Sequence, residues 1–219
     1  MTKVHRNPSF EEEHKKWKEG FLVAGVDEVG RGAFAGPLVV SAVVFPPFFS
    51  TDSAAQKIIH EVTDSKLLSP KKRDELLIEI IKHAQIITVV EISVRIINNL
   101  GVGKANQIGF RKAIQNLQNL IENKPLFALL DGFPAPYAKG GRKNQMAIVK
   151  GDQKSLSIAA ASIVAKVHRD NYMKMLNGKY AKYQFGKHKG YGTILHRNLL
   201  QKYGLSPLHR DAFCRNTLA

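Results

Sequence analysis

The chain has 219 residues, and its 33 Lys and Arg against 18 Asp and Glu give a formal net charge of +15. Its single cysteine, Cys214, excludes disulfides and multi-cysteine zinc sites and indicates a reducing compartment. The longest apolar run, residues 37–49, falls short of the ~20 residues that a membrane-spanning helix needs, and the N-terminus lacks the apolar core of a signal peptide. We therefore expect a cytoplasmic protein without membrane association, and the positive charge favours a nucleic-acid partner over the alternative of solubility alone.

The first half of the chain predicts a short helix, a hairpin, a second helix and a strand. Residues 9–18 form the helix, with Ser9 as its N-cap. The apolar runs 21–24 and 37–45 are bounded by Gly and Pro, which predicts two buried strands with Asp27 and Glu28 at the mouth of their hairpin. The remaining elements are a helix that opens at Ser69-Pro70 and a strand over 86–92.

The second half continues the alternation of helices and strands, which predicts α/β layers around one main sheet. The predicted elements are an amphipathic helix over 104–122, a strand over 126–130 that ends at Asp131, a basic loop over 132–144, a strand over 146–149, a long helix over 155–176, a Lys- and Gly-rich loop over 182–190 and a helix over 193–203. Composition changes near residue 178, where a basic tail begins, so we divide the chain into a leader (1–20), a main domain (21–177) and a C-terminal helical part (178–219).

Four carboxylates stand next to buried strands or turns: Asp27, Glu28, Asp131 and Asp152. Residues at strand ends converge at one edge of a layered sheet, and gathered carboxylates repel one another unless a metal ion neutralises them. Oxygen ligands with few histidines nearby favour magnesium or manganese. Two such ions about 3.5–4 Å apart can activate a water and stabilise the leaving oxygen of a phosphodiester. The alternative for each residue is a helix cap or a turn.

The turn Gly30-Arg31-Gly32 has the composition of a backbone that approaches a sugar–phosphate chain. It fails as a dinucleotide-binding fingerprint, because its glycine spacing is one residue too long and a strand follows it. Residues 101–104, Gly-Val-Gly-Lys, fail as a phosphate loop for lack of the full spacing. Arg31 could bind a phosphate, and the alternative is a plain hairpin turn with an exposed arginine.

The segment 187–192 places Tyr191 among lysines and glycines, a combination that suits a nucleic-acid backbone and a stacked sugar or base. A structural tyrosine is the alternative. The segment Leu208-His209-Arg210 could likewise be a basic face and nothing more.

Six separated motifs together resemble bacterial ribonuclease HII, a type 2 ribonuclease H, over about residues 21–213. They are GVDEVGRGAFAGPLVVSAVV, TDSKLLSPKKR, LLDG, VKGDQKSLSIAAASIVAKVHRD, HKGYGT and SPLHRDAF. The related type HIII enzymes usually carry GTG at the glycine turn and a large N-terminal extension, so the GRG turn and the short leader favour type HII.

The resemblance implies a ribonuclease-H-like α/β fold with a central mixed sheet flanked by helices and a small C-terminal helical subdomain. It implies that Asp27, Glu28, Asp131 and Asp152 are catalytic ligands of two Mg²⁺ or Mn²⁺ ions. The implied activity is hydrolysis of the RNA strand of RNA–DNA hybrids and incision 5′ to single ribonucleotides embedded in duplex DNA. The products would carry 5′-phosphate and 3′-hydroxyl ends, and the reaction would initiate removal of the ribonucleotide.

The resemblance also assigns substrate contacts to Gly30, Arg31, Gly32, Lys66 and Tyr191. The GRG backbone would recognise the 2′-hydroxyl that distinguishes RNA from DNA, Tyr191 would stack on the next deoxyribose, and Lys66 would contact a phosphate. We expect a monomer. This chain departs from many members by having Gly101 in place of asparagine and by its unusually basic loop 132–144.

The sequence leaves two other functions open. The first is a basic nucleic-acid-binding protein whose carboxylates are structural, and the second is another metal-dependent nuclease of the same fold class, such as a junction resolvase.

Overall fold

The computed structural model describes residues 8–47, 49, 61–62, 68–121 and 124–218. In this part of the chain, a five-stranded sheet has the order β3-β2-β1-β4-β5. The strands are β1 (Leu22–Val29), β2 (Leu38–Val44), β3 (Ile86–Ile92), β4 (Leu126–Asp131) and β5 (Gln145–Ile148). Strand β2 runs antiparallel to both β1 and β3, whereas β4 runs parallel to β1 and β5 parallel to β4. The predicted central mixed sheet is confirmed.

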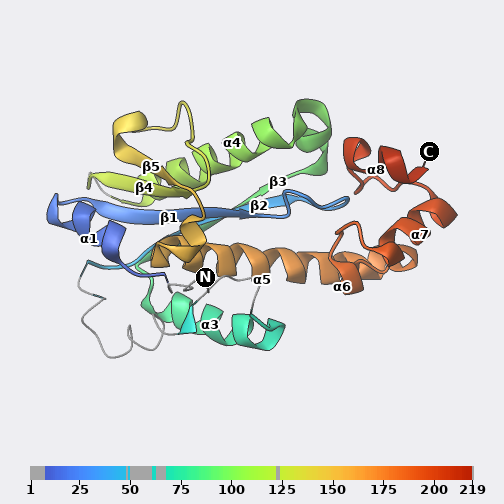
Figure 1. Ribbon diagram of the computed structural model, residues 1–219, viewed down its shortest axis with the longest axis horizontal. Helices are drawn as coiled ribbons and strands as arrows, with labels where there is room; N and C mark the ends of the chain where they lie inside the picture. Colours follow the sequence, from blue (N-terminus) through green and yellow to red (C-terminus); the bar gives the residue numbers. More distant parts are fainter. Residues whose placement is uncertain (1–7, 48, 50–60, 63–67, 122–123, 219) are drawn as a thin grey trace, which may run out of the picture.

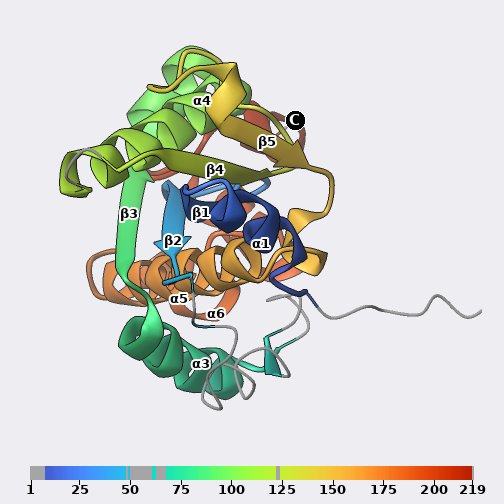
Figure 2. The same ribbon diagram turned by 90° about the vertical axis from the view of Figure 1, so that its left-hand side faces the viewer.

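Helices cover both faces of the sheet (Figures 1 and 2). The long helix α4 (Val94–Leu120) packs on the face that receives the even-numbered residues of β1 and β2, and α5 (Leu156–Lys179) lies on the opposite face. Helices α1 (Glu11–Lys18) and α3 (Pro70–His83) are on the α5 side. At Gly25 an added β-carbon would overlap the carbonyl carbon of Ser157, so glycine there permits the close approach of α5 to β1.

Serine side chains begin two of the predicted helices. The Oγ of Ser69 accepts the Lys72 N–H at 3.2 Å, with Pro70 in the first helical position, and the Oγ of Ser155 accepts the Ile158 N–H at 3.2 Å. Ser9 is the predicted N-cap of α1, but Phe10 occupies the N-cap position, and the Ser9 Oγ accepts the Glu11 N–H of the first turn at 3.4 Å. The Ser9 backbone also pairs with the start of α5, where its carbonyl accepts the Leu156 N–H at 2.9 Å.

Three features of the secondary structure differ most from the sequence-based expectation. Helix α4 begins at Val94, well before residue 104, and continues through a kink at Gly101, whose φ of 78° and ψ of 155° suit only glycine. Strand β1 continues to Val29, so Asp27 and Glu28 belong to the strand and do not lie at the mouth of the hairpin. The predicted loop 182–190 contains a short helix, α6 (Phe185–His188).

The C-terminal part is helical, as expected, and consists of α6, α7 (Ile194–Tyr203) and α8 (Asp211–Leu218) at one end of the molecule (Figure 1). Its apolar cluster includes Phe185, Leu200 and Cys214, which are fully buried together with Met173 of α5. Helix α5 therefore packs against both the sheet and the C-terminal helices. The division of the chain into three parts stays a prediction. No helix in the described ranges combines the length and hydropathy needed to cross a bilayer.

Candidate active site

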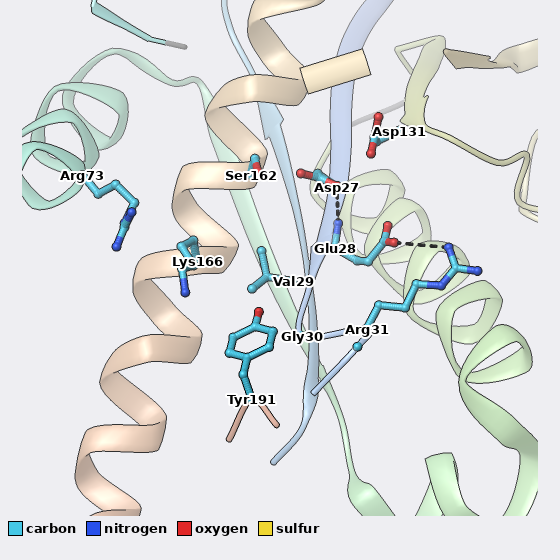
Figure 3. Close-up of a pocket in the computed structure, with 11 residues that line it drawn as sticks. Asp27, Glu28, Val29, Gly30, Arg31, Arg73, Asp131, Ser162, Lys166 and Tyr191 are labelled. Carbon is cyan, nitrogen blue, oxygen red and sulfur yellow. Dashed lines mark hydrogen bonds and ion pairs between the residues drawn. The ribbon is translucent and has the colours of Figure 1, made fainter. Parts of the chain in front are cut away.

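The parallel pairing of β1 and β4 brings two distant carboxylates to the same edge of the sheet. Val26 lies opposite Leu130, so the next residues on the two strands are Asp27 and Asp131. Both line a pocket of about 560 Å³ together with Glu28, the glycine turn and Tyr191 (Figure 3). Residues from distant motifs of the sequence therefore meet in one place.

Asp27 faces helix α5 and is only 4% exposed. Its Oδ1 accepts the Glu28 N–H at 2.7 Å, and a hydrogen bond from Ser162 of α5 also reaches its carboxylate. Burial raises the pKa of Asp27 well above its ordinary value, and the negative charges of Glu28 and Asp131 raise it further. The hydrogen bonds compensate this only in part.

Glu28 follows Asp27 in the strand and therefore points to the opposite layer, where Asn106 of α4 hydrogen-bonds it. Burial, followed by the charge of Asp131, raises the pKa of Glu28 to about 7, although Arg31 Nη1 lies 3.7 Å from its Oε1. The buried Oε2 has no hydrogen-bond donor within the described ranges. Such an oxygen, in a carboxylate with a raised pKa, is suited to a bound cation.

Asp152 is close to Asp131 in the fold but occupies a different position relative to the pocket. The Gly151 N–H donates to Oδ1 of Asp131 at 2.6 Å, and Asp152 follows in the turn Gly151–Gln153. Asp152 is 5% exposed, and it is not among the residues that line the pocket. Of the four predicted carboxylates, three therefore line the pocket, and Asp152 does not. Within the described residues, no three His, Cys, Asp or Glu side chains already converge as a metal centre.

The side chain of Arg210 holds the glycine turn by hydrogen bonds to its backbone carbonyls. Its Nη1 donates to the carbonyls of Gly30 at 2.7 Å and Arg31 at 3.1 Å, and its Nη2 and Nε donate to the carbonyl of Gly36 at 2.8 and 3.1 Å. The side chain is fully buried. The interpretation of residues 208–210 as a basic face is therefore wrong for Arg210, whose guanidinium supports backbone inside the protein.

Arg169 of α5 is a second buried guanidinium in the same region, and it joins the turn to the segment of Tyr191. It donates to the carbonyls of Ala35 at 2.9 Å, Pro37 at 3.0 Å and Lys189 at 2.8 Å. Its Cζ also lies 5.1 Å from the centre of the Tyr191 ring. One side chain thus connects the backbone that follows the glycine turn with the segment that contains Tyr191.

Three polar residues that were not among the predicted site residues also line the pocket: Arg73 of α3, and Ser162 and Lys166 of α5. Ser162 and Lys166 are four residues apart on one helical face, and Lys166 Nζ donates to Asp170 at 2.8 Å and lies 5.4 Å from the centre of the Tyr191 ring. In the sequence, this pair could have been found as two polar residues four positions apart in a segment that is otherwise small and apolar, which places both on one face of the helix. Lys66, the expected phosphate contact, lies outside the described residues.

A mixed sheet with helices on both faces, an acidic pocket at one sheet edge and helices at the C-terminus defines a ribonuclease-H-like α/β enzyme. Solved structures agree with this class. Ribonuclease H2 from Pyrococcus horikoshii OT3 is similar with a TM-score of 0.72 and 28% identity, covering 90% of this chain and 96% of that chain. Bst-RNase HIII in complex with Mn²⁺ has a TM-score of 0.69 over 91% and 70% of the two chains, and its 18% identity makes this a likeness of fold.

The family follows from sequence comparisons. A family model described as Ribonuclease HII matches residues 24–216. The Ribonuclease HII of Caldicellulosiruptor bescii is 44% identical over 96% of this chain and 95% of its own length, and that of Dehalococcoides mccartyi is 40% identical over 94% and 92%. The chain belongs to the ribonuclease HII family, and it is an endoribonuclease with ribonuclease H activity on RNA–DNA hybrids.

Proposed function

We propose that the chain is a divalent-metal-dependent endonuclease that incises DNA 5′ to single embedded ribonucleotides, in addition to hydrolysing the RNA strand of hybrids. The products carry 5′-phosphate and 3′-hydroxyl ends, and the incision starts removal of the ribonucleotide. The observation that carries this proposal is the shared pocket of Asp27, Glu28 and Asp131 with Gly30, Gly32 and Tyr191. The carboxylates, which are suited to metal-dependent hydrolysis, therefore share one pocket with the residues suited to recognising a ribose.

The residues fit a divalent cation. The raised pKa values of Asp27 and Glu28 mean that these carboxylates need positive charge to be ionised together, and Oε2 of Glu28 lacks a donor among the described residues. The ligands available are carboxylate oxygens, which favour Mg²⁺ or Mn²⁺. The Mn²⁺ bound by Bst-RNase HIII, a protein of similar fold, supports the same choice.

Asp27, Glu28, Asp131 and Asp152 would hold two ions, which supply Lewis-acid stabilisation of a phosphodiester and activation of a water. Asp152 would join from the turn whose Gly151 N–H already supports Asp131. Asp27 and Glu28 are consecutive in β1 and therefore point to opposite layers, where Ser162 hydrogen-bonds Asp27 and Asn106 hydrogen-bonds Glu28.

Recognition of the ribonucleotide is assigned to the backbone of Gly30, Arg31 and Gly32 and to the ring of Tyr191. The 2′-hydroxyl is the group that distinguishes RNA from DNA at one position, and a glycine backbone can approach it closely. Figure 3 shows the Tyr191 hydroxyl end directed into the pocket, where the ring can stack on the next deoxyribose. Lys166 and Arg73 add cations at the pocket wall for phosphates, and Lys66 is proposed as a further phosphate contact.

Incision of a defined substrate tests the proposal. A DNA duplex with one ribonucleotide, incubated with Mn²⁺ or Mg²⁺, is expected to be cut on the 5′ side of the ribonucleotide, while an all-DNA duplex stays intact. Asp27→Asn is expected to abolish incision, and Asp74→Asn, the same change at an exposed carboxylate of α3, is expected to leave it unchanged. Undiminished incision by Asp27→Asn, or incision without a divalent cation, would contradict the proposal.

The same experiment separates the two competing functions. A nucleic-acid-binding protein with structural carboxylates would bind the duplex but would not cut it, whichever divalent metal ion is added. A junction resolvase would cut an all-DNA four-way junction, which the proposed enzyme leaves intact.

A further inference from the structure

Three buried histidines join the separate segments of the C-terminal part. His188 ends α6, His196 lies in the first turn of α7, and His209 precedes α8; none is more than 7% exposed. The rings of His188 and His196 stack with centroids 4.1 Å apart and an angle of 16° between their planes. Nε2 of His196 and Nε2 of His209 are 3.0 Å apart. The proposed roles of the pocket residues use none of these side chains.

The partners of His196 and His209 fix where each ring carries its proton. Nδ1 of His196 lies 2.9 Å from the carbonyl oxygen of Tyr191, which can only accept, so Nδ1 carries the proton and Nε2 is an acceptor. Nδ1 of His209 accepts the Ser206 N–H at 2.8 Å, so the proton of that ring is on Nε2. The short distance between the two Nε2 atoms is then a hydrogen bond from His209 to His196.

His188 is neutral by the same reasoning. Its Nε2 lies 2.7 Å from the carbonyl oxygen of Tyr183 and donates to it, and its Nδ1 accepts the Gly190 N–H at 3.2 Å. Every ring nitrogen of the three histidines therefore has a partner. None keeps a free lone pair, which excludes metal binding by this cluster as it stands, and an added proton on His196 would set two N–H groups against each other.

The chain of hydrogen bonds has a direction and an end point. It runs from the Ser206 N–H through His209 and His196 to the carbonyl of Tyr191, which also accepts the Thr193 N–H at 2.8 Å. On the other side of Tyr191, His188 holds the Gly190 N–H. The two histidine contacts bracket the backbone of the residue whose ring lines the pocket.

We infer that His196 and His209 are positioning residues, which through a chain of neutral imidazoles fix Tyr191 for stacking on the nucleotide next to the ribonucleotide. The inference rests on the proposed function of Tyr191. It extends the recognition machinery to side chains that do not touch the substrate, and it couples the loop before α8 to the pocket.

The proton positions are tested directly by long-range ¹H–¹⁵N NMR of the imidazole rings in the full-length protein. The expected spectrum at neutral pH shows His196 with its proton on Nδ1, and His188 and His209 with theirs on Nε2. Any other tautomer at His196 or His209 would rule out the hydrogen-bond chain from Ser206 through His209 and His196 to Tyr191, which we call the histidine relay. This result does not depend on the activity of the enzyme.

The positioning role is tested by variants that keep or remove one hydrogen bond. In His196→Asn the amide can still donate from the Nδ1 position, whereas His196→Leu cannot, so only the leucine variant is expected to lose about tenfold in kcat/KM on the embedded ribonucleotide. In a Tyr191→Ala background the same His196→Leu change is expected to have no further effect, because the group it positions is gone. An additive loss in that background would overturn the inference.

A second pair covers the case in which His196→Leu fails to fold. His209→Gln keeps a donor at the Nε2 position and is expected to match the wild type, whereas His209→Leu is expected to reproduce the loss; equal losses in both would overturn the inference. If Tyr191→Ala alone leaves incision unchanged, the proposed stacking of Tyr191 is wrong. The NMR result still decides whether the relay exists.

Discussion

Arg169 packs so closely against Gly30 that residue 30 has no room for a side chain. A β-carbon added to Gly30 would lie 2.8 Å from Cδ of Arg169 and would overlap its Nε. Gly30 also has a φ of 93°, in the region that favours glycine. The recognition turn is therefore shaped by a buried guanidinium on α5, with which a larger residue would collide.

Gly30→Ala is expected to destabilise the protein by about 2–4 kcal/mol, because it combines a steric clash with an unfavourable backbone angle. Incision of an embedded ribonucleotide is expected to fall by at least about tenfold. Denaturant unfolding and a cleavage assay would measure both effects. Gly32→Ala is the matched control for stability, since a β-carbon there meets no atom within 4 Å. Equal stability losses for the two variants would contradict the role of Arg169.

Arg210→Lys is expected to destabilise the protein by about 2–4 kcal/mol, because one ammonium group cannot serve the carbonyls of Gly30, Arg31 and Gly36 together. Incision should fall with it, since the turn loses its support. The control is Arg197→Lys on α7, where the arginine is exposed and donates to a single carbonyl, that of Gly192. Urea unfolding of both variants checks the prediction, and a neutral effect of Arg210→Lys would refute it.

Glu28→Gln is expected to stabilise the metal-free protein at pH 8 while abolishing incision. The pKa of Glu28 is raised from 4.5 to about 7 in the fold, so the unfolded chain binds fewer protons between these values and stability falls as pH rises through them. Removing the charge should then raise the free energy of unfolding at pH 8 by on the order of 1–3 kcal/mol, and by little near pH 4.5. Urea unfolding in a chelator at the two pH values measures this. If Glu28→Gln instead lowers the free energy of unfolding at pH 8, the ionised carboxylate of Glu28 does not destabilise the fold and the prediction is wrong.

The histidine relay predicts a pH dependence of the opposite sign. The pKa of both His196 and His209 is lowered from 6.5 to about 4, mainly by burial and also by the neighbouring His188, while Asp211 opposes the shift at His209. The unfolded chain therefore binds more protons in this range, and this contribution to stability is lost as pH falls from about 6.5 to about 4. His209→Gln should lose less stability than the wild type between pH 7 and pH 5. Because Asp27 and Glu28 act in the opposite direction, the comparison of the two proteins decides, and identical slopes would contradict the prediction.

The strands and the carboxylates on them were predictable from local sequence. The apolar segments 86–92 and 126–131 became β3 and β4 at the predicted positions, because short β-branched and apolar runs between turn residues have few other ways to be buried. The start of α4 was not predictable in this way. Residues 94–103 contain asparagines and glycines that disfavour a helix, and a distant contact compensates: Asn98 donates to the His209 carbonyl and accepts the Asp211 N–H, both at 3.2 Å.

The roles of the two buried arginines were equally hidden. Arg169 and Arg210 lie in segments with other charged residues, which is typical of an exposed basic face, and their partners are backbone carbonyls that no sequence pattern marks. The shared pocket of Asp27 and Asp131 depended on strand order, which local patterns leave open. The position of the four carboxylates next to strands and turns singled them out, and the resemblance of the motifs then assigned them together as metal ligands.

The parallel register of β1 and β4 also determines which changes of chain length the site can absorb. Val26 faces Leu130, and side chains alternate between the two layers. Deleting one residue within β1 would move Glu28 into the place of Asp27 and turn each carboxylate toward the wrong helix. Adding residues to the loop after Gly132 would leave both strands in register. We therefore expect natural length variation to collect in that loop and to be absent from these two strands, which makes insertions and deletions a more severe test of the site than most substitutions.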